Sequence, residues 1–316
     1  MKINYKKILT PLLALSILSA CHQNKKESLE PSKNESNVST DEFVNFAVSE
    51  FASEETSDNR IAAIKPKPKS ICGAKVTKNA TITGLAIRLS FDGTMECEYG
   101  DQKITKQGEV FLQLTKGTKW SKMGSQISIT FNQYKVYKQY GIENPKDSLL
   151  GIFNGTVFVS NLTGGLVNEL DKGEAPIVHE VKSDNLKVDY DNRGLLKTMQ
   201  NILRRETATN VGGDQIEVKV TGTKTINGID NIATWGKTSS GADYYGRITA
   251  PIVYNTCNSE TKAISGFLFY KKGTVEISET YGVNNSGIPV NNCTAYGFKQ
   301  EVKYSGGATN TKVIKY

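Results

Sequence analysis

Residues 127–132 read Ile-Ser-Ile-Thr-Phe-Asn, with an apolar side chain at every second position. Because successive side chains of a β-strand point to opposite faces, this alternation places one row on a core and the other in water. The same period of two recurs at residues 216–221 (Ile-Glu-Val-Lys-Val-Thr) and 275–278 (Val-Glu-Ile-Ser). The chain is therefore predicted to be all-β, with antiparallel strands in a β-sandwich-like arrangement.

Further strands are expected where β-branched and aromatic residues cluster between turn signals. These strands are Thr81–Phe91, Glu109–Leu114, Gly155–Val159, Ile264–Tyr270 and Ala295–Tyr304. The pairs Asn154-Gly155 and Asn227-Gly228 predict tight turns, because both residue types tolerate positive φ.

One segment has two readings. Residues 195–205 (Leu-Leu-Lys-Thr-Met-Gln-Asn-Ile-Leu-Arg-Arg) carry apolar residues at helical spacing, and their propensities favour a helix. Neighbouring strands can override such a preference. The sequence therefore leaves both helix and strand open for residues 194–206.

The polar stretch 171–192, expected to be irregular, is the best candidate for a boundary between two β lobes. The N-terminal lobe would cover residues 71–170 and the C-terminal lobe residues 171–316. A weak internal similarity supports two lobes, since each contains a cysteine, an expected hairpin, a glycine turn and a second cysteine.

The N-terminus has the pattern of an export signal. Lysines at positions 2, 6 and 7 precede an apolar run of 11 residues, 8–18, whereas a membrane-spanning helix needs about 20. The run ends in Leu18-Ser19-Ala20-Cys21, which resembles the lipobox of bacterial lipoproteins. The resemblance implies that residues 1–20 are removed and that Cys21 receives diacylglycerol, with a further acyl chain such as palmitate on the new amino end.

Residues 21–70 are expected to connect the lipid to the β body. Residues 22–40 are rich in Lys, Glu, Ser and Asn, which is typical of a disordered, flexible tether. Thr40 precedes two acids, and the aromatic residues Phe43, Phe46 and Phe51 follow at helical spacing. We predict a short amphipathic helix at residues 41–52, and we favour docking on its own domain, or partial fraying, over recognition of a partner.

Four cysteines remain after Cys21, namely Cys72, Cys97, Cys257 and Cys293. An even number in an exported protein favours disulfides. We favour the pairs Cys72–Cys97 and Cys257–Cys293, since each brackets a compact strand-like stretch. Zinc is the competing interpretation, but the closely spaced cysteine pairs of structural zinc sites are missing from the sequence.

The β pattern also resembles the uncharacterised lipoproteins abundant in Bacteroidota, over most of residues 72–316. The first group of resembling segments is Ile87–Gly93, Cys97, Gln107–Phe111, Gly124–Tyr134, Gly151 and Gly155-Thr156. The second group is Val220–Thr223, Ile248–Ile252, Cys257, Ile264–Gly266 and Gly282 before Cys293. This chain departs from the family at the longer insert Val283–Asn292 and in carrying Asn292 where an aspartate is common. The family implies a scaffold and a location, and no known reaction.

Lipoprotein resemblance implies delivery to the outer membrane, because His22 rather than aspartate follows Cys21. The run Lys25-Lys26-Glu27 partly matches surface-export signals, so we expect the cell surface rather than the periplasmic face. The net charge of +7 falls to +4 without the signal segment. That excess is too small to indicate nucleic-acid binding, so the expected partner is the membrane, with a glycan or an envelope protein as a further partner.

Catalytic signals are weak. The folded part contains one histidine, His179, which we expect on the surface or in a turn rather than in a catalytic triad. Paired carboxylates could act as in glycosidases, but spacing selects no pair among 32 acids. The cluster Asp184, Asp189, Asp191 and Asn192 could hold Ca²⁺ but lacks the 12-residue loop pattern. We therefore expect no enzyme, no cofactor and no metal.

Aromatic residues are the remaining signal. Trp120 lies among lysines in an expected loop, and Tyr134 and Tyr137 follow a strand. Exposed aromatic faces can stack on sugars, so these three form a candidate ligand platform. Packing in the core or across strands is the alternative, and alternation places Tyr134 and Tyr137 on opposite faces. The leading hypothesis is a non-enzymatic binding or structural envelope lipoprotein, and the alternative is a carbohydrate-binding or glycan-processing surface protein.

Overall fold

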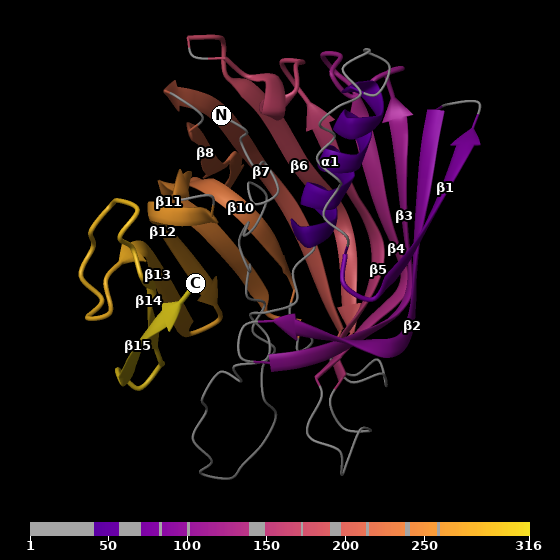
Figure 1. The fold of residues 1–316 in the computed structure, drawn as a ribbon. Helices are drawn as coiled ribbons and strands as arrows, with labels where there is room; N and C mark the ends of the chain where they lie inside the picture. Colours follow the sequence, from indigo (N-terminus) through magenta and orange to yellow (C-terminus); the bar gives the residue numbers. More distant parts are fainter. Residues whose placement is uncertain are drawn as a thin grey trace.

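The computed structural model describes residues 41–56, 71–81, 84–99, 102–138, 149–171, 173–189, 197–212, 215–237, 241–257 and 260–316. Predictions for the signal segment, Cys21 and the tether 22–40 lie outside these residues, as do those for Asp191 and Asn192. Within them, the chain forms one α-helix, one short 3₁₀ helix (Val167–Glu169) and fifteen strands, and the strand pairings are antiparallel. The all-β prediction is therefore confirmed (Figure 1).

The helix is α1 (Asp41–Thr56), and it confirms the predicted helix at 41–52. The first seven strands are β1 (Ala74–Thr81), β2 (Gly84–Tyr99), β3 (Gln102–Lys116), β4 (Gln126–Lys138), β5 (Leu149–Asn161), β6 (Ile177–Asp189) and β7 (Lys197–Gly212). The next four are β8 (Gln215–Gly222), β9 (Lys224–Ile226), β10 (Ile229–Lys237) and β11 (Asp243–Cys257). The last four are β12 (Glu260–Lys272), β13 (Val275–Val283), β14 (Gly297–Lys303) and β15 (Thr309–Lys315).

Neighbours in sequence are mostly neighbours in the sheet. The order runs from β1 to β7, then from β10 to β15, with β9 paired to β10. Strand β7 pairs with β10 through residues 199–202 and with β8 through residues 204–212. Strand β8 also pairs with β11, so β8 and β10 both lie between β7 and β11. The meander is therefore interrupted at β7, where the sheet forks into β8 and β10.

A row of bulges bends the first half of the sheet. The register shifts in all five consecutive pairings from β2–β3 to β6–β7, at adjoining positions. Gly108 of β3 lies in this row at φ +106°, and a Cβ there would overlap the carbonyl oxygen of Gln133 on β4. Because each bulge increases local twist and bends its strand, an aligned row curls the whole sheet. The sheet therefore curves around α1 (Figure 1).

One choice that the sequence left open is decided here, and two sequence predictions change. Residues 197–205 are strand, because β7 pairs along both edges and those ladder bonds outweigh helical propensity. The stretch 171–192 is not irregular, since residues 177–189 form β6. Asn154-Gly155 is not a hairpin turn but part of the bulge in β5. Asn227-Gly228 does form the predicted turn, between β9 and β10, with φ values of 51° and 76°.

The core residues form two main clusters. The larger one joins α1 to the inner face of β2–β7, and the second lies among β8 and β10–β14. Pairing of β5 with β6 continues across the predicted lobe boundary at residue 170. The larger core extends to Ile202 of β7, and the second begins at Val220 of β8.

Candidate functional site

Helix α1 lies on the concave face of the sheet (Figure 1). Its apolar side chains belong to the larger core cluster. Phe43, Ala47 and Phe51 recur every four residues and are buried, as is Val44 beside them. This spacing places them on one side of a helix. The prediction that the helix docks on its own domain is confirmed.

Phe43 is the apolar centre of this contact. Its ring packs edge-on against those of Phe91, Phe131 and Tyr134, with centroids 6.2, 5.2 and 5.1 Å away. The side chain is fully buried. Edge-to-face pairs at these distances add specific geometry to the hydrophobic gain of about 2–3 kcal/mol for burying a phenyl ring.

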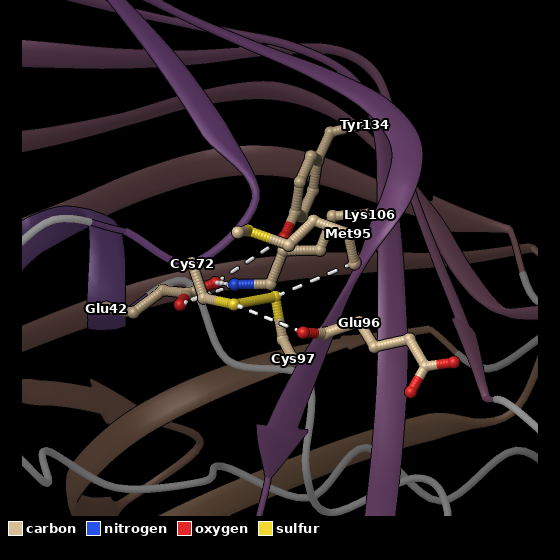
Figure 2. A network of polar contacts seen from close by, with 7 residues as sticks. All are labelled: Glu42, Cys72, Met95, Glu96, Cys97, Lys106 and Tyr134. Carbon is tan, nitrogen blue, oxygen red and sulfur yellow. Dashed lines mark hydrogen bonds and ion pairs between the residues drawn. A yellow bond between two sulfur atoms is a disulfide. The ribbon is translucent and has the colours of Figure 1, made fainter.

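A buried ion pair joins α1 to β3 (Figure 2). Lys106 of β3 places its Nζ 2.8 Å from both carboxylate oxygens of Glu42, and the Tyr134 hydroxyl donates to Oε1 of Glu42 at 3.4 Å. The Lys106 side chain is only 3% exposed, whereas Glu42 is 22% exposed. A buried ammonium without an opposite charge nearby would destabilise the fold. The Glu42 carboxylate therefore stabilises Lys106 at this position.

A second ion pair holds the other part of the helix. Lys78 of β1 lies 2.5 Å from the carboxylate of Glu50, whose side chain is 3% exposed. Together the two pairs fix the direction of α1 along the sheet. We call Lys78, Phe91, Lys106, Phe131 and Tyr134 the helix-binding site.

The predicted disulfides are both present. Cys72–Cys97 joins the turn before β1 to β2, and Cys257–Cys293 joins the end of β11 to the loop between β13 and β14. Figure 2 places the first of them next to Glu42 and Lys106. The bridge thus secures the strands beneath the first turn of α1.

The predicted ligand platform is not formed. Trp120 and Tyr134 are each 1% exposed, so neither can present a face to a sugar in solution, and Tyr137 is half-buried on the other face of β4. Trp120 is buried because its turn folds over the sheet. Its carbonyl accepts hydrogen bonds from Ser125 Oγ at 2.6 Å and from Asn161 Nδ2 at 3.0 Å. The three residues therefore do not share one exposed face.

His179 is buried against Trp120. Our prediction that it lies on the surface or in a turn is therefore wrong. It belongs to β6 and pairs with Asn161 on β5 and Glu206 on β7. The rings of Trp120 and His179 are 5.0 Å apart, and His179 Nε2 has no hydrogen-bond partner among the described residues. Burial lowers the pKa of His179 to about 4, so the imidazole is neutral near pH 7.

A third polar cluster, Glu279 with Tyr281 and Gln300, was missed at the sequence level. Tyr281 donates to one carboxyl oxygen of Glu279 at 2.7 Å, and Gln300 donates to the other at 2.8 Å. Burial raises the pKa of Glu279, although these hydrogen bonds lower it. The alternation of Val275 and Ile277 extends to position 279 and was the signal that could have found it.

Other kinds of site receive no support within the described parts of the chain. They contain no group of three or more His, Cys, Asp or Glu side chains able to hold a metal ion. They also contain no helix long and apolar enough to cross a membrane. The helix-binding site holds a carboxylate and a phenyl ring that a helix presents.

No family model, no curated protein and no solved structure matches this chain.

Proposed function

We propose that this protein is a non-enzymatic lipoprotein of the bacterial envelope, with binding or structural duties. Cys21 would carry the lipid and hold the chain to the outer membrane, with the body at the cell surface. Two acyl chains suffice for stable attachment, whereas a single chain binds only marginally.

The attachment of α1 is the observation that supports this proposal most. The helix begins 20 residues after Cys21, and its first turn carries Glu42 and Phe43. A flexible segment of that length has a typical reach of about 25 Å. Any pull from a lipid anchor would thus arrive at the first turn of α1, where Lys106 and the aromatic rings bind it.

The disulfides fit the same proposal. Two bridges are typical of an oxidising compartment outside the cytosol. The polar clusters also favour structural duties, because Glu42 and Glu279 both have partners that stabilise the fold.

Cell fractionation of Cys21→Ser tests the proposal, with Ser28→Ala as the matched control in the same segment. The control should remain in the membrane fraction, and Cys21→Ser should become soluble or keep its signal segment. Identical fractionation of the two variants would refute lipid anchoring. Protease treatment of intact cells tests exposure, since a surface protein is cleaved without permeabilisation.

A further inference from the structure

The helix is held on the sheet through side chains. The phenyl ring of Phe43 and the carboxylates of Glu42 and Glu50 supply its most specific contacts. A helix satisfies its backbone hydrogen bonds internally. Helix α1 can therefore leave and return without breaking any ladder of the sheet, which no strand of this fold can do.

The groups beneath α1 favour binding of another helix that carries the same side chains. Departure of α1 would leave the Lys106 ammonium without its carboxylate and would expose Phe91, Phe131 and Tyr134 to water. The Lys106 Nζ also lies 6.0 Å from the centre of the Phe91 ring. The occupant that satisfies these groups is a helix that carries a carboxylate followed directly by an aromatic residue, as Glu42 and Phe43 do.

We propose that the helix-binding site also accepts α1 from a second copy of this chain, so that neighbouring molecules exchange their helices. The partner's helix would supply the same carboxylate and ring, and the contacts of the exchanged form would equal those within one chain. Fourteen residues, 57–70, separate α1 from Ile71. Fully extended, a segment of that length spans about 45 Å, which is enough to reach an adjacent body.

Concentration decides between the two forms, because their contacts are equal. A helix joined by a short linker has an effective concentration of about 1 mM at its own site. Dilute protein therefore keeps α1 in its own chain. Confinement to a membrane raises the local concentration of copies, and this step rests on the lipid anchor proposed above.

The ion pair allows a direct test, since a water-soluble carbodiimide joins a carboxylate to an adjacent amine as an amide and releases the corresponding urea. Full-length lipidated protein, half of it ¹⁵N-labelled, is incorporated densely into phosphatidylethanolamine–phosphatidylglycerol vesicles and then cross-linked. We expect peptides that join Glu42 of one isotope to Lys106 of the other. Cross-links within one isotope only, or no Glu42–Lys106 amide at all, would overturn the proposal.

A second experiment does not depend on lipid. A fluorescent peptide of residues 41–56 is added to full-length protein carrying Glu42→Gln and Phe43→Ala, with circular dichroism to verify that the β fold persists. We expect saturable binding that weakens at least tenfold on adding Lys106→Met but not Lys103→Met, the matched change at an exposed position of β3. Absence of binding to a folded variant would refute the acceptor site itself, whereas peptide binding with unmixed isotopes on vesicles would overturn exchange alone.

Discussion

Replacing His179 by phenylalanine should remove a large part of the acid sensitivity of this protein. Phenylalanine keeps a planar ring against Trp120 and removes the Nε2 atom that has no partner among the described residues. The groups that face His179 are Asn161, Trp120 and Glu206. Glu206 is itself paired with Arg204 at 3.1 Å, so burial dominates the environment of the imidazole.

The sign and size follow from the pKa. Burial lowers the pKa of His179 from 6.5 to about 4 in the folded protein. Below pH 6.5 the unfolded chain therefore binds a proton that the folded chain resists, and the free energy of unfolding falls as the pH falls through this window. With these two pKa values, the free energy of unfolding falls by about 2 kcal/mol between pH 8 and pH 5.

Urea unfolding between pH 5 and pH 8 measures this loss. The wild-type protein should lose about 2 kcal/mol more than His179→Phe over that interval, with unchanged m-values. His22→Gln, which alters the only other histidine, is the control and should behave like the wild type. Equal pH dependence of His179→Phe and the wild type would show that the reasoning is wrong.

Three further outcomes are expected. Glu279→Gln should become more stable relative to the wild type as the pH rises above 4.5. Burial raises the pKa of the Glu279 carboxyl, so the folded wild-type protein loses stability when this group is deprotonated. A parallel pH dependence of the two proteins in calorimetry would contradict this. Lys106→Met should destabilise the docked helix by about 1–3 kcal/mol, since the Glu42 carboxylate loses its cation. Hydrogen exchange of the α1 amides should therefore accelerate in this variant. Equal exchange rates in Lys103→Met and Lys106→Met would argue against the ion pair. Loss of the Cys72–Cys97 bridge by double alanine substitution should cost about 3.5 kcal/mol for the 25-residue separation; an unchanged urea midpoint would exclude this stabilisation.

Local patterns predicted the parts of the fold that depend on local geometry. Alternation at residues 127–132 and 275–278 predicts strands, because the period of two belongs to the extended backbone itself. The helical spacing of Phe43 and Phe51 predicts α1 and its buried side for the same reason. Asn227-Gly228 predicts a turn because these residue types accept positive φ. The cysteine pairs were found because each closes a short stretch of strands.

Tertiary contacts decided the rest. The helical propensity of residues 197–205 was overridden because β7 gains ladder bonds along both edges. Trp120 and His179 are buried because a turn and a strand far apart in the sequence meet across the sheet. Lys106 and Glu42 are separated by 64 positions, so no local period could pair them. The sequence by itself determined which segments extend and which coil, since backbone periodicity is local; only the curled sheet decided which polar groups lie inside, since burial depends on what arrives from elsewhere in the chain.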